Sequence, residues 1–421
     1  MTEKLLQYLW NFKIFNRFDF KDTQGRELEI LNYGSWNSQA GPDFLLAKIK
    51  VDNLILAGHI ELHLRSSDWE AHQHSKDIAY DNVILHAVYE HDKEIDFLRE
   101  KNISTLQLKE YINPSVLEKY NEICVPQDFI PCEKIIDADK IPVNFSEETV
   151  LNKLDEKSNE LEAQLHQYKN NYEAVLFHRL AYAFGLKVNA EIFQLLAQSI
   201  DFGVVQKIRQ NREQLEALLL GKAGWLSQPF DVQMKRWSQE YDYVKSKFSC
   251  SDLEFNPKFL RLRPQNFPTL RLSQLAHLYH KEVHLFSRLM DAKNLHEMME
   301  VFAGVQASSY WDSRYNFGAE SEMVYPKILS SDFIYRIIIN AVLPLRYAYY
   351  KQVKEEIADE ILEFYSALPA EKNHILKKWE NLGLKMNSAL QSQSFLYQYK
   401  NFCLSKNCLN CSIAFQFLKG E

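Results

Sequence analysis

The amino-acid sequence predicts an α+β protein, in which an N-terminal mixed α/β domain with a small central sheet precedes a large all-helical region. Three observations predict this fold class. Runs with strand composition end near residue 108, and apolar residues recur at helical spacing from residue 146 onward. Between them, residues 124–142 contain three prolines and few periodic positions. We therefore expect one domain at residues 1–140 and a second at residues 141–421.

The composition is that of an ordinary globular protein, with 421 residues, 46% hydrophobic and 25% charged. A chain of this length can bury more than one core without disulfides or structural metal. Its net charge of −7 argues against coating nucleic acid through bulk positive charge, but a local basic groove stays open. No apolar run is long enough to cross a bilayer, and the first residues do not resemble a signal peptide. We therefore expect a cytoplasmic protein with no membrane partner.

The first domain is predicted to begin with an amphipathic helix at residues 3–16. Short runs rich in β-branched and apolar residues then predict strands at residues 28–31, 44–51, 54–65, 83–89 and 103–108. The second and third runs flank Asp52-Asn53, a two-residue signal for a hairpin turn. The fourth run is apolar throughout, which is typical of a strand buried on both faces.

Apolar residues at helical spacing dominate the second domain. The predicted helices span residues 146–172, 174–184, 190–198, 203–220, 231–248, 272–292, 295–305, 333–359 and 371–382. No regular repeat period is present, which argues against a solenoid.

One predicted strand carries an unusual set of polar side chains. It reads Gly58-His-Ile-Glu-Leu-His-Leu-Arg65. Because side chains of a strand alternate between its faces, the polar ones share one face and the apolar ones the other. The polar face then gathers two imidazoles, a carboxylate and a guanidinium, from His59, Glu61, His63 and Arg65.

A second carboxylate, that of Asp43, lies at the start of the partner strand. With a strict two-residue turn, Asp43 lies opposite Leu62, within one residue of Glu61 and His63. A kink or a bulge is needed to direct it toward Glu61. Two carboxylates on neighbouring strands can hold Mg²⁺ or Mn²⁺, which activates water and neutralises a phosphate. The predicted metal ligands are Asp43, Glu61, His59 and His63, and the predicted catalytic residues are Asp43, Glu61, His63, Lys48 and Arg65.

This arrangement resembles the PD-(D/E)XK nucleases, which have a restriction-endonuclease-like fold. The matching residues are Pro42-Asp43 and Glu61-Leu62-His63, followed by a short helix and a buried strand. His63 stands where the family has lysine, and Lys48, on the same face of the hairpin, would replace it. The resemblance implies a metal-dependent phosphodiesterase that acts on DNA or RNA.

Two other interpretations of the polar strand stay open. In one, Glu61 and His63 form a structural polar network with Arg65 and Asp68, and the protein is a non-catalytic binding or scaffold protein with structural metal sites. In the other, a zinc or manganese site serves a hydrolase of small substrates. Its candidate ligands are His59, Glu61, His63, His72 and His74. His86 lies in an apolar strand and is interpreted as a core histidine.

Three of the six cysteines form a C-x4-C-x2-C pattern near the end of the chain, at Cys403, Cys408 and Cys411. Such spacings let three thiolates converge on zinc or on a [4Fe–4S] cluster, both of which take four ligands. Cys132 is the leading candidate for the fourth ligand. The alternatives are Cys124, Cys250 or a nearby histidine, or three partly buried thiols with no metal. Some PD-(D/E)XK nucleases tie the chain end to the nuclease domain with an iron–sulfur cluster, and this pattern resembles theirs with a different spacing.

A basic segment in the second domain is the candidate nucleic-acid contact. Arg261, Arg263 and Arg271 would bind phosphates while Phe267 stacks on a base. The alternative is an ordered loop whose arginines cap helices or pair with acidic neighbours.

Several motifs together resemble a bacterial family known as domain of unknown function 2851. They are Gly41-Pro-Asp-Phe44, Gly58 to Trp69, Tyr80 to His86, Arg261 to Pro268, Tyr310 to Gly318 and the terminal cysteines. The resemblance covers nearly the whole chain and implies a full-length member of that family. It implies no particular activity.

Overall fold

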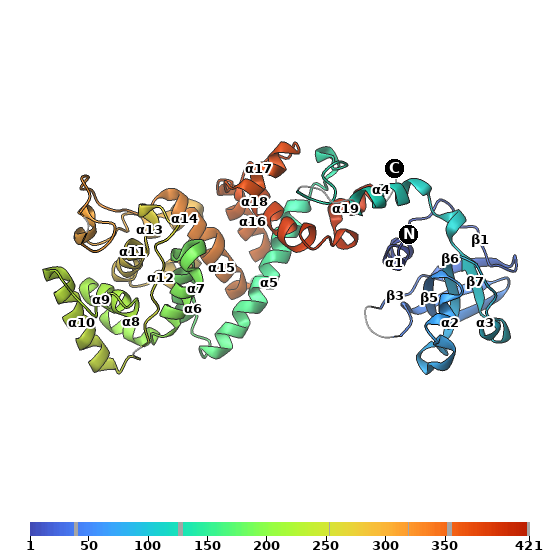
Figure 1. Cartoon of the computed structure of the whole chain (residues 1–421), viewed down its shortest axis with the longest axis horizontal. Coiled ribbons are helices and arrows are strands. Elements are labelled where there is room, and N and C mark those ends of the chain that lie inside the picture. The colour runs from blue at the N-terminus through green and yellow to red at the C-terminus, as the bar shows by residue number, and fades with distance from the viewer. Residues whose placement is uncertain (38–40, 125–128, 252, 319, 352–355, 419–421) are drawn as a thin grey trace. The chain divides into compact units, whose positions relative to one another are not determined.

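The computed structural model describes residues 1–37, 41–124, 129–251, 253–318, 320–351 and 356–418 (Figure 1). It confirms an α+β fold, with a sheet in the N-terminal part and helices after it. The chain forms two compact units. The first contains Met1–Phe145, Lys378–Leu384 and the chain from Gln398 onward; the second contains Ser146–Lys377 and Lys385–Tyr397. The expected boundary at residue 140 is close to this division, but the cysteine segment belongs to the first unit and not to the helical region.

The described part of the first unit contains a seven-stranded mixed sheet in the order β1-β2-β4-β5-β6-β7, with β3 also paired to β4. The strands are β1 (Phe20–Lys21), β2 (Glu27–Asn32), β3 (Ser35–Trp36), β4 (Phe44–Val51), β5 (Leu54–Arg65), β6 (Val83–Glu90) and β7 (Ser104–Gln107). The pairs from β1 to β5 are antiparallel, whereas β5, β6 and β7 are parallel. All five predicted strands are confirmed, including the hairpin bounds.

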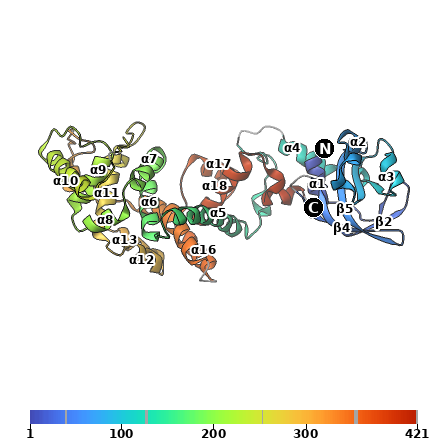
Figure 2. The same cartoon turned by 90° about the horizontal axis from the view of Figure 1, so that it is seen from below.

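Helices lie on both sides of this sheet, with α1 on one side and α3 on the other in both views (Figures 1 and 2). Those of the first unit are α1 (Glu3–Asn11), α2 (Asp68–Ala71), α3 (Asp96–Glu100), α4 (Pro114–Cys124) and α19 (Ser412–Leu418). The side chain of Thr2 caps α1 by accepting from Leu5 N, and α1 packs against β5. The helix ends at Asn11, five residues before the predicted end, because the chain turns at Lys13 with a φ of 56°.

Helices form most of the second unit. They are α5 (Phe145–Gln167), α6 (Tyr172–Phe184), α7 (Leu186–Gln198), α8 (Phe202–Ile208), α9 (Arg212–Lys222), α10 (Val232–Phe248), α11 (Pro268–Lys281), α12 (Leu285–Asp291), α13 (Leu295–Phe302), α14 (Ser331–Ile337), α15 (Leu343–Tyr350), α16 (Ile357–Ala367), α17 (His374–Asn381) and α18 (Ala389–Gln398). Longer connections lie between α10 and α11 and between α13 and α14. Phe145 and the last residues of α17 and α18 belong to the first unit.

Three predicted helices are divided in the structure. The one at 203–220 becomes α8 and α9, because Asn211 caps a new helix by accepting from Gln214 N. The one at 272–292 becomes α11 and α12, separated by the extended backbone of Glu282. The one at 333–359 contains a π-helical turn, Ile338–Val342, just before Pro344, which has no N–H for the helical ladder. α3, α4, α18 and α19 were not predicted.

Among the described residues, no helix is both long enough and apolar enough to cross a bilayer.

The pairing of β4 with β5 contains a bulge. From the sequence alone, a kink or a bulge of this kind was needed to direct Asp43 toward Glu61. From Val51↔Leu54 to Ala47↔Gly58 the strands keep one register, but Phe44 pairs with Ile60, one residue out of step. The extra residue is accommodated at Leu46, which has a φ of 57° and an exposed side chain. One residue beyond Phe44, Asp43 therefore lies opposite Glu61 and not Leu62.

We expect Leu46→Gly to raise the free energy of unfolding by about 1 kcal/mol, because a left-handed backbone strains every residue with a Cβ. The measurement is the midpoint of urea unfolding. Lys48→Gly, on the same strand and also exposed, is the matched control and should lower stability by about 0.5–1 kcal/mol, since glycine in a regular strand is entropically unfavourable. A loss of stability in Leu46→Gly as large as in the control would contradict a strained bulge.

Candidate metal centre

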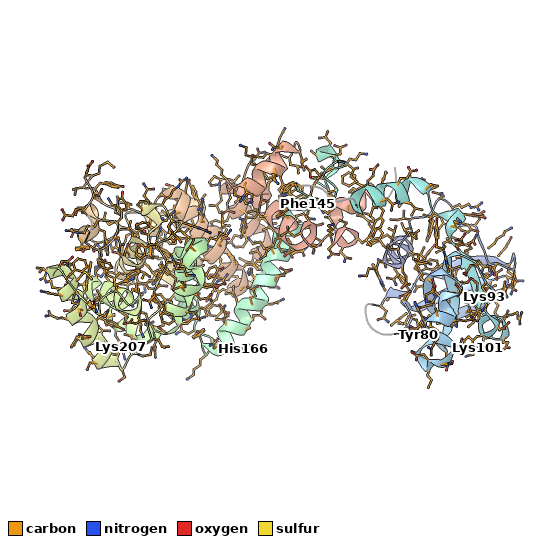
Figure 3. All side chains as sticks on the ribbon, viewed as in Figure 1. Tyr80, Lys93, Lys101, Phe145, His166 and Lys207 are labelled. Carbon is orange, nitrogen blue, oxygen red and sulfur yellow. The ribbon has the colours of Figure 1, made fainter. Side chains whose placement is uncertain are left out.

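Four histidines and a glutamate meet on the central strands of the first unit. Glu61 and His63 are on β5, and His86 is on the neighbouring parallel strand β6. His72 follows α2, and His74 begins a short 3-10 turn. The turn is held in place by Tyr80, labelled in Figure 3, whose ring stacks on that of His74 at 3.8 Å. Glu61, His63, His74 and His86 are buried, whereas His72 is exposed, so the group reaches the surface at His72.

Four separations between donor atoms of this group are close to those around one tetrahedral ion. Glu61 Oε1 lies 3.5 Å from His63 Nε2 and 3.3 Å from His74 Nε2. His63 Nε2 lies 3.1 Å from His72 Nδ1 and 3.3 Å from His74 Nε2. A tetrahedral zinc ion with ligands at about 2.0–2.1 Å holds its donor atoms about 3.3–3.4 Å apart. The four measured separations are close to this spacing. The three imidazoles have donor atoms all within 4.8 Å of one another, and Glu61 adjoins two of them.

The proton positions also suit a metal ligand. Burial lowers the pKa of His63 to about 2 and that of His86 to about 3, so both rings are neutral near pH 7. His63 Nδ1 lies 2.9 Å from His86 Nε2. If Nδ1 carries the proton and donates it to His86, the Nε2 lone pair of His63 faces the other donors, as metal ligation demands.

Asp43 lies beside the group and braces Glu61. Its Oδ2 accepts a hydrogen bond from Leu62 N at 3.0 Å, and its Oδ1 accepts one from Gln7 Nε2 at 2.8 Å. Its own backbone N–H donates to Glu61 Oε2 at 3.0 Å. Glu61 is therefore held with Oε2 toward Asp43 and Oε1 toward the imidazoles.

Burial makes these two carboxyl groups hard to ionise without a cation. It raises the pKa of Asp43 to about 7, with repulsion from Glu61 as the next cause. It raises the pKa of Glu61 to about 8, and the charge of Glu3 adds to the shift. A divalent cation bound here would stabilise the ionised form of both carboxyl groups. The neutral imidazoles next to them could donate their lone pairs to the same cation.

The structure does not bring three predicted residues into this group. Lys48 pairs with Ala57, four residues before Glu61 on β5, which is about 13 Å at the rise of a strand. Arg65 is exposed at the end of β5. His59 accepts a hydrogen bond from Leu46 N at 3.3 Å, so its ring supports the bulge.

Other residues enter the site that were not among the chosen candidates. His72 and His74 were weighed only as alternatives, and His86 as a core histidine, because a loop and an apolar strand give no periodic signal. His86 is fully buried as expected, but it also contacts His63. Glu3 and Gln7, one turn apart on α1, approach the group from a helix that sequence reasoning treated only as a packing element.

In the second unit, the proposed nucleic-acid contacts are not all on the surface. Arg261 and Arg263 are exposed, and Phe267 is half-buried with its ring edge-on to Phe259 at 5.2 Å. The first two are available to a ligand, and Phe267 is partly engaged in packing.

Arg271 is instead part of the interior. Its guanidinium lies 3.6 Å from the ring centre of Phe333 and donates to Asn266 and Gln274, at 2.7 and 2.9 Å. Burial lowers its pKa to about 9. The structure therefore gives Arg271 a place in the packing of this unit.

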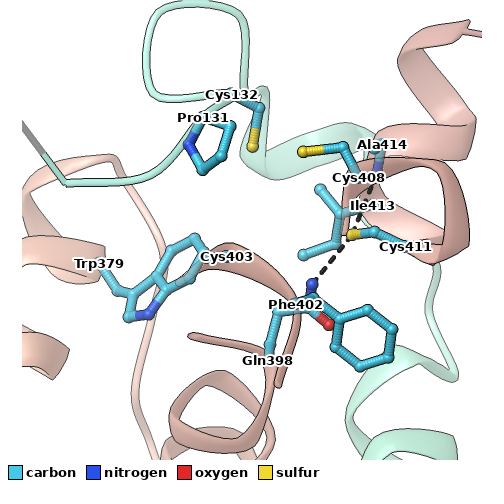
Figure 4. A pocket seen from close by; sticks show the side chains of 10 residues that line it. All are labelled: Pro131, Cys132, Trp379, Gln398, Phe402, Cys403, Cys408, Cys411, Ile413 and Ala414. Atoms are coloured by element: carbon cyan, nitrogen blue, oxygen red, sulfur yellow. Dashed lines mark hydrogen bonds between the residues drawn. The ribbon is translucent and has the colours of Figure 1, made fainter. Parts of the chain in front are cut away.

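The predicted cysteine group assembles within the first unit (Figure 4). One cavity is lined by Cys132, Cys403, Cys408 and Cys411. Burial raises the pKa of Cys132 to about 12. Cys250 belongs to the second unit, and the side chain of Cys124 lies outside the described residues. The leading candidate for the fourth ligand is thus the one that lines the cavity.

The fold and this site define an α+β protein of two units, the first of which carries a histidine–carboxylate group on a mixed sheet. The chain belongs to the family described as Protein of unknown function (DUF2851), whose model matches residues 3–374. This confirms the family resemblance seen in the motifs. The matched range includes the whole histidine–carboxylate group. Comparison with curated proteins and with solved structures gave no match.

We expect His86→Gln to weaken zinc binding by about 10- to 100-fold, because His86 orients the ring of His63 without being a ligand. Competition with a coloured chelator measures the affinity. His91→Gln is the matched control, since His91 contacts Glu94 outside the group. Equal affinities for the two variants would show that His86 does not orient a ligand.

The raised pKa of Glu61 also predicts how stability depends on pH in the metal-free protein. The folded state keeps a proton that the unfolded chain loses above its ordinary pKa of 4.5. The stabilisation is therefore complete below pH 4.5 and is lost as the pH rises to about 8. With a chelator present, the advantage in urea midpoint of wild type over Glu61→Gln should shrink between pH 5 and pH 8.5. A difference that does not change with pH would contradict the burial of this carboxyl.

Proposed function

We propose that this chain is a metal-dependent phosphodiesterase that acts on DNA or RNA, with its metal held by Glu61, His63, His72 and His74. One observation carries the proposal: Glu61 and three histidines bring donor atoms together, with four separations of 3.1–3.5 Å, and Asp43 adjoins them through its backbone N–H, which donates to Glu61. A site with one metal and an adjacent acid is what hydrolysis of a phosphodiester needs.

The donor set favours zinc or manganese over magnesium. Magnesium prefers oxygen ligands in octahedral geometry, whereas imidazoles suit zinc and manganese. When bound, the divalent cation supplies a Lewis acid that activates water and neutralises charge on the phosphate.

The residues around the ligands have separate tasks in this proposal. Asp43, with a pKa of about 7, accepts a proton from the attacking water at a pH where it is half ionised. His86 and Gln7 orient His63 and Asp43 through their hydrogen bonds. Arg65, exposed at the end of the same strand as His63, steadies a phosphate oxygen.

The order of elements supports the nuclease-like version. Pro42-Asp43 immediately precedes β4, Glu61-Leu62-His63 lies on the antiparallel neighbour β5, and β6 follows parallel after α2. This is the order expected from the resemblance to PD-(D/E)XK nucleases. The bulge at Leu46 supplies the change of register that the resemblance required of Asp43. His63 holds the position of the family's lysine as a ligand.

A second candidate is a non-catalytic binding or scaffold protein with a structural zinc ion. It is favoured by the number of protein donors, since four complete a tetrahedron, whereas catalytic zinc usually keeps one position for water. Catalysis therefore requires one donor to give way, and His72, exposed at the surface, is the one able to do so.

Cleavage of labelled single- and double-stranded DNA and RNA in Mn²⁺, Zn²⁺ or Mg²⁺ tests the proposal. We expect wild type to cleave with Mn²⁺ or Zn²⁺. Asp43→Asn should keep the metal and lose at least about 100-fold in rate, as for removal of a general base, whereas Glu61→Gln should lose both. Asp81→Asn, an exposed carboxylate bound to Lys101, is the control and should behave as wild type. Tight zinc binding by Glu61 and the histidines with no cleavage of any substrate would replace the proposal with the structural site.

A further inference from the structure

The cysteine cavity of the first unit is built from two distant parts of the chain. Cys132 lies in a turn, and its backbone C=O accepts hydrogen bonds from Ile135 N and Ile136 N. The other three follow one another closely: Cys403 ends a π-helical turn, Cys408 begins a 3-10 turn, and Cys411 immediately precedes α19. Between the first two of these, Lys406 has a φ of 53°, which reverses the chain so that both can line one cavity.

The thiols lie near one another but are too widely spaced for one ion. Four sulfurs at about 2.3 Å from a zinc ion would lie about 3.8 Å apart. Over the described residues, no three cysteine sulfurs come within 4.8 Å of one another, although the three imidazoles near Glu61 do. The same chain thus holds one group spaced for an ion and one spaced for something larger.

We propose that Cys132, Cys403, Cys408 and Cys411 bind a [4Fe–4S] cluster. Such a cluster takes four cysteine thiolates and separates them by its four irons and four sulfides. On transfer from a synthetic cluster with small thiolate ligands, each cysteine gives its proton to one departing thiolate and forms one Fe–S bond. No electron is transferred in this exchange, and four small thiols are released.

The surroundings of the cavity suit such a cluster. Gln398 Nε2 donates to Cys411 Sγ at 2.9 Å and Ala414 N donates to the same sulfur at 3.5 Å. N–H donors of this kind stabilise the negative charge of a cluster sulfur. Trp379 and Ile413 form an apolar wall around the sulfurs, which limits access of water (Figure 4).

The cluster would fix the end of the chain to the candidate metal centre's own unit. Directly after Cys411, α19 places Phe415 against Phe12, at 4.9 Å between ring centres, and against Tyr8. Tyr8 is in α1, and Phe12 is the C-cap residue of this helix. The same helix carries Gln7, whose side chain donates a hydrogen bond to Asp43.

The test uses the full chain, treated anaerobically with a synthetic [4Fe–4S] cluster and then freed of unbound iron. We expect about four irons and four labile sulfides per chain, with a broad visible absorption band that bleaches on reduction. The double variant Cys403→Ala with Cys408→Ala should retain less than a quarter of this iron. Cys250→Ala is the matched control, because this cysteine lies in the second unit, and it should retain all of it.

The stoichiometry of wild type decides the matter even if the double variant fails to fold. Wild type that takes up no cluster, or that binds one zinc ion at these cysteines without labile sulfide, would overturn the proposal. Iron uptake that is equal in the double variant would do so as well. None of these readouts depends on hydrolysis of nucleic acid, so the cluster and the phosphodiesterase can each fail alone.

Discussion

The pairing of β4 with β5 determines where every polar group of the candidate metal centre lies. A regular ladder would direct Asp43 toward the apolar face of the hairpin, because side chains alternate strictly along a strand. The bulge at Leu46 inserts one residue and reverses that assignment for the residues before it. Asp43 and Glu61 then meet through a backbone hydrogen bond, and the imidazoles gather around the remaining oxygen of Glu61.

Desolvation gives this group its chemical character. Glu61, His63 and His86 are buried in the middle of a sheet, where charged forms are unfavourable. The imidazoles of His63 and His86 therefore remain neutral, and the carboxyls of Asp43 and Glu61 tend to keep their protons, in line with the directions of their pKa shifts. A cation reverses the balance for the acids and uses the lone pairs of the imidazoles. Burial would therefore destabilise the folded protein if these residues formed only a polar network. The same burial makes them suitable ligands for a cation.

The two cysteine-bearing segments extend the same unit by different means. The turn at Cys132 lies close to the sheet in the sequence, whereas Gln398 to Leu418 reaches it only after the helical unit is complete. Contacts of Phe415 with Tyr8 and Phe12 join this segment to α1, the helix that also braces Asp43. The end of the chain and the candidate centre therefore share one structural support.

The sequence by itself determined the fold class, the five main strands with the hairpin at Asp52-Asn53, most of the helices, and the residue types that carry chemistry. These follow from local periodicity and turn chemistry, which act over a few residues. It also indicated the C-x4-C-x2-C pattern with Cys132 as its partner. Only the tertiary structure decided the rest. The position of Asp43 depends on a bulge, whose cost is offset by hydrogen bonds to residues far along the chain. His72 and His74 join the centre because a loop folds back over β5, and Lys48 is excluded because its place on the strand is too distant. The cysteine segment joined the first unit because its packing partners are in α1 and α4, which no local pattern records.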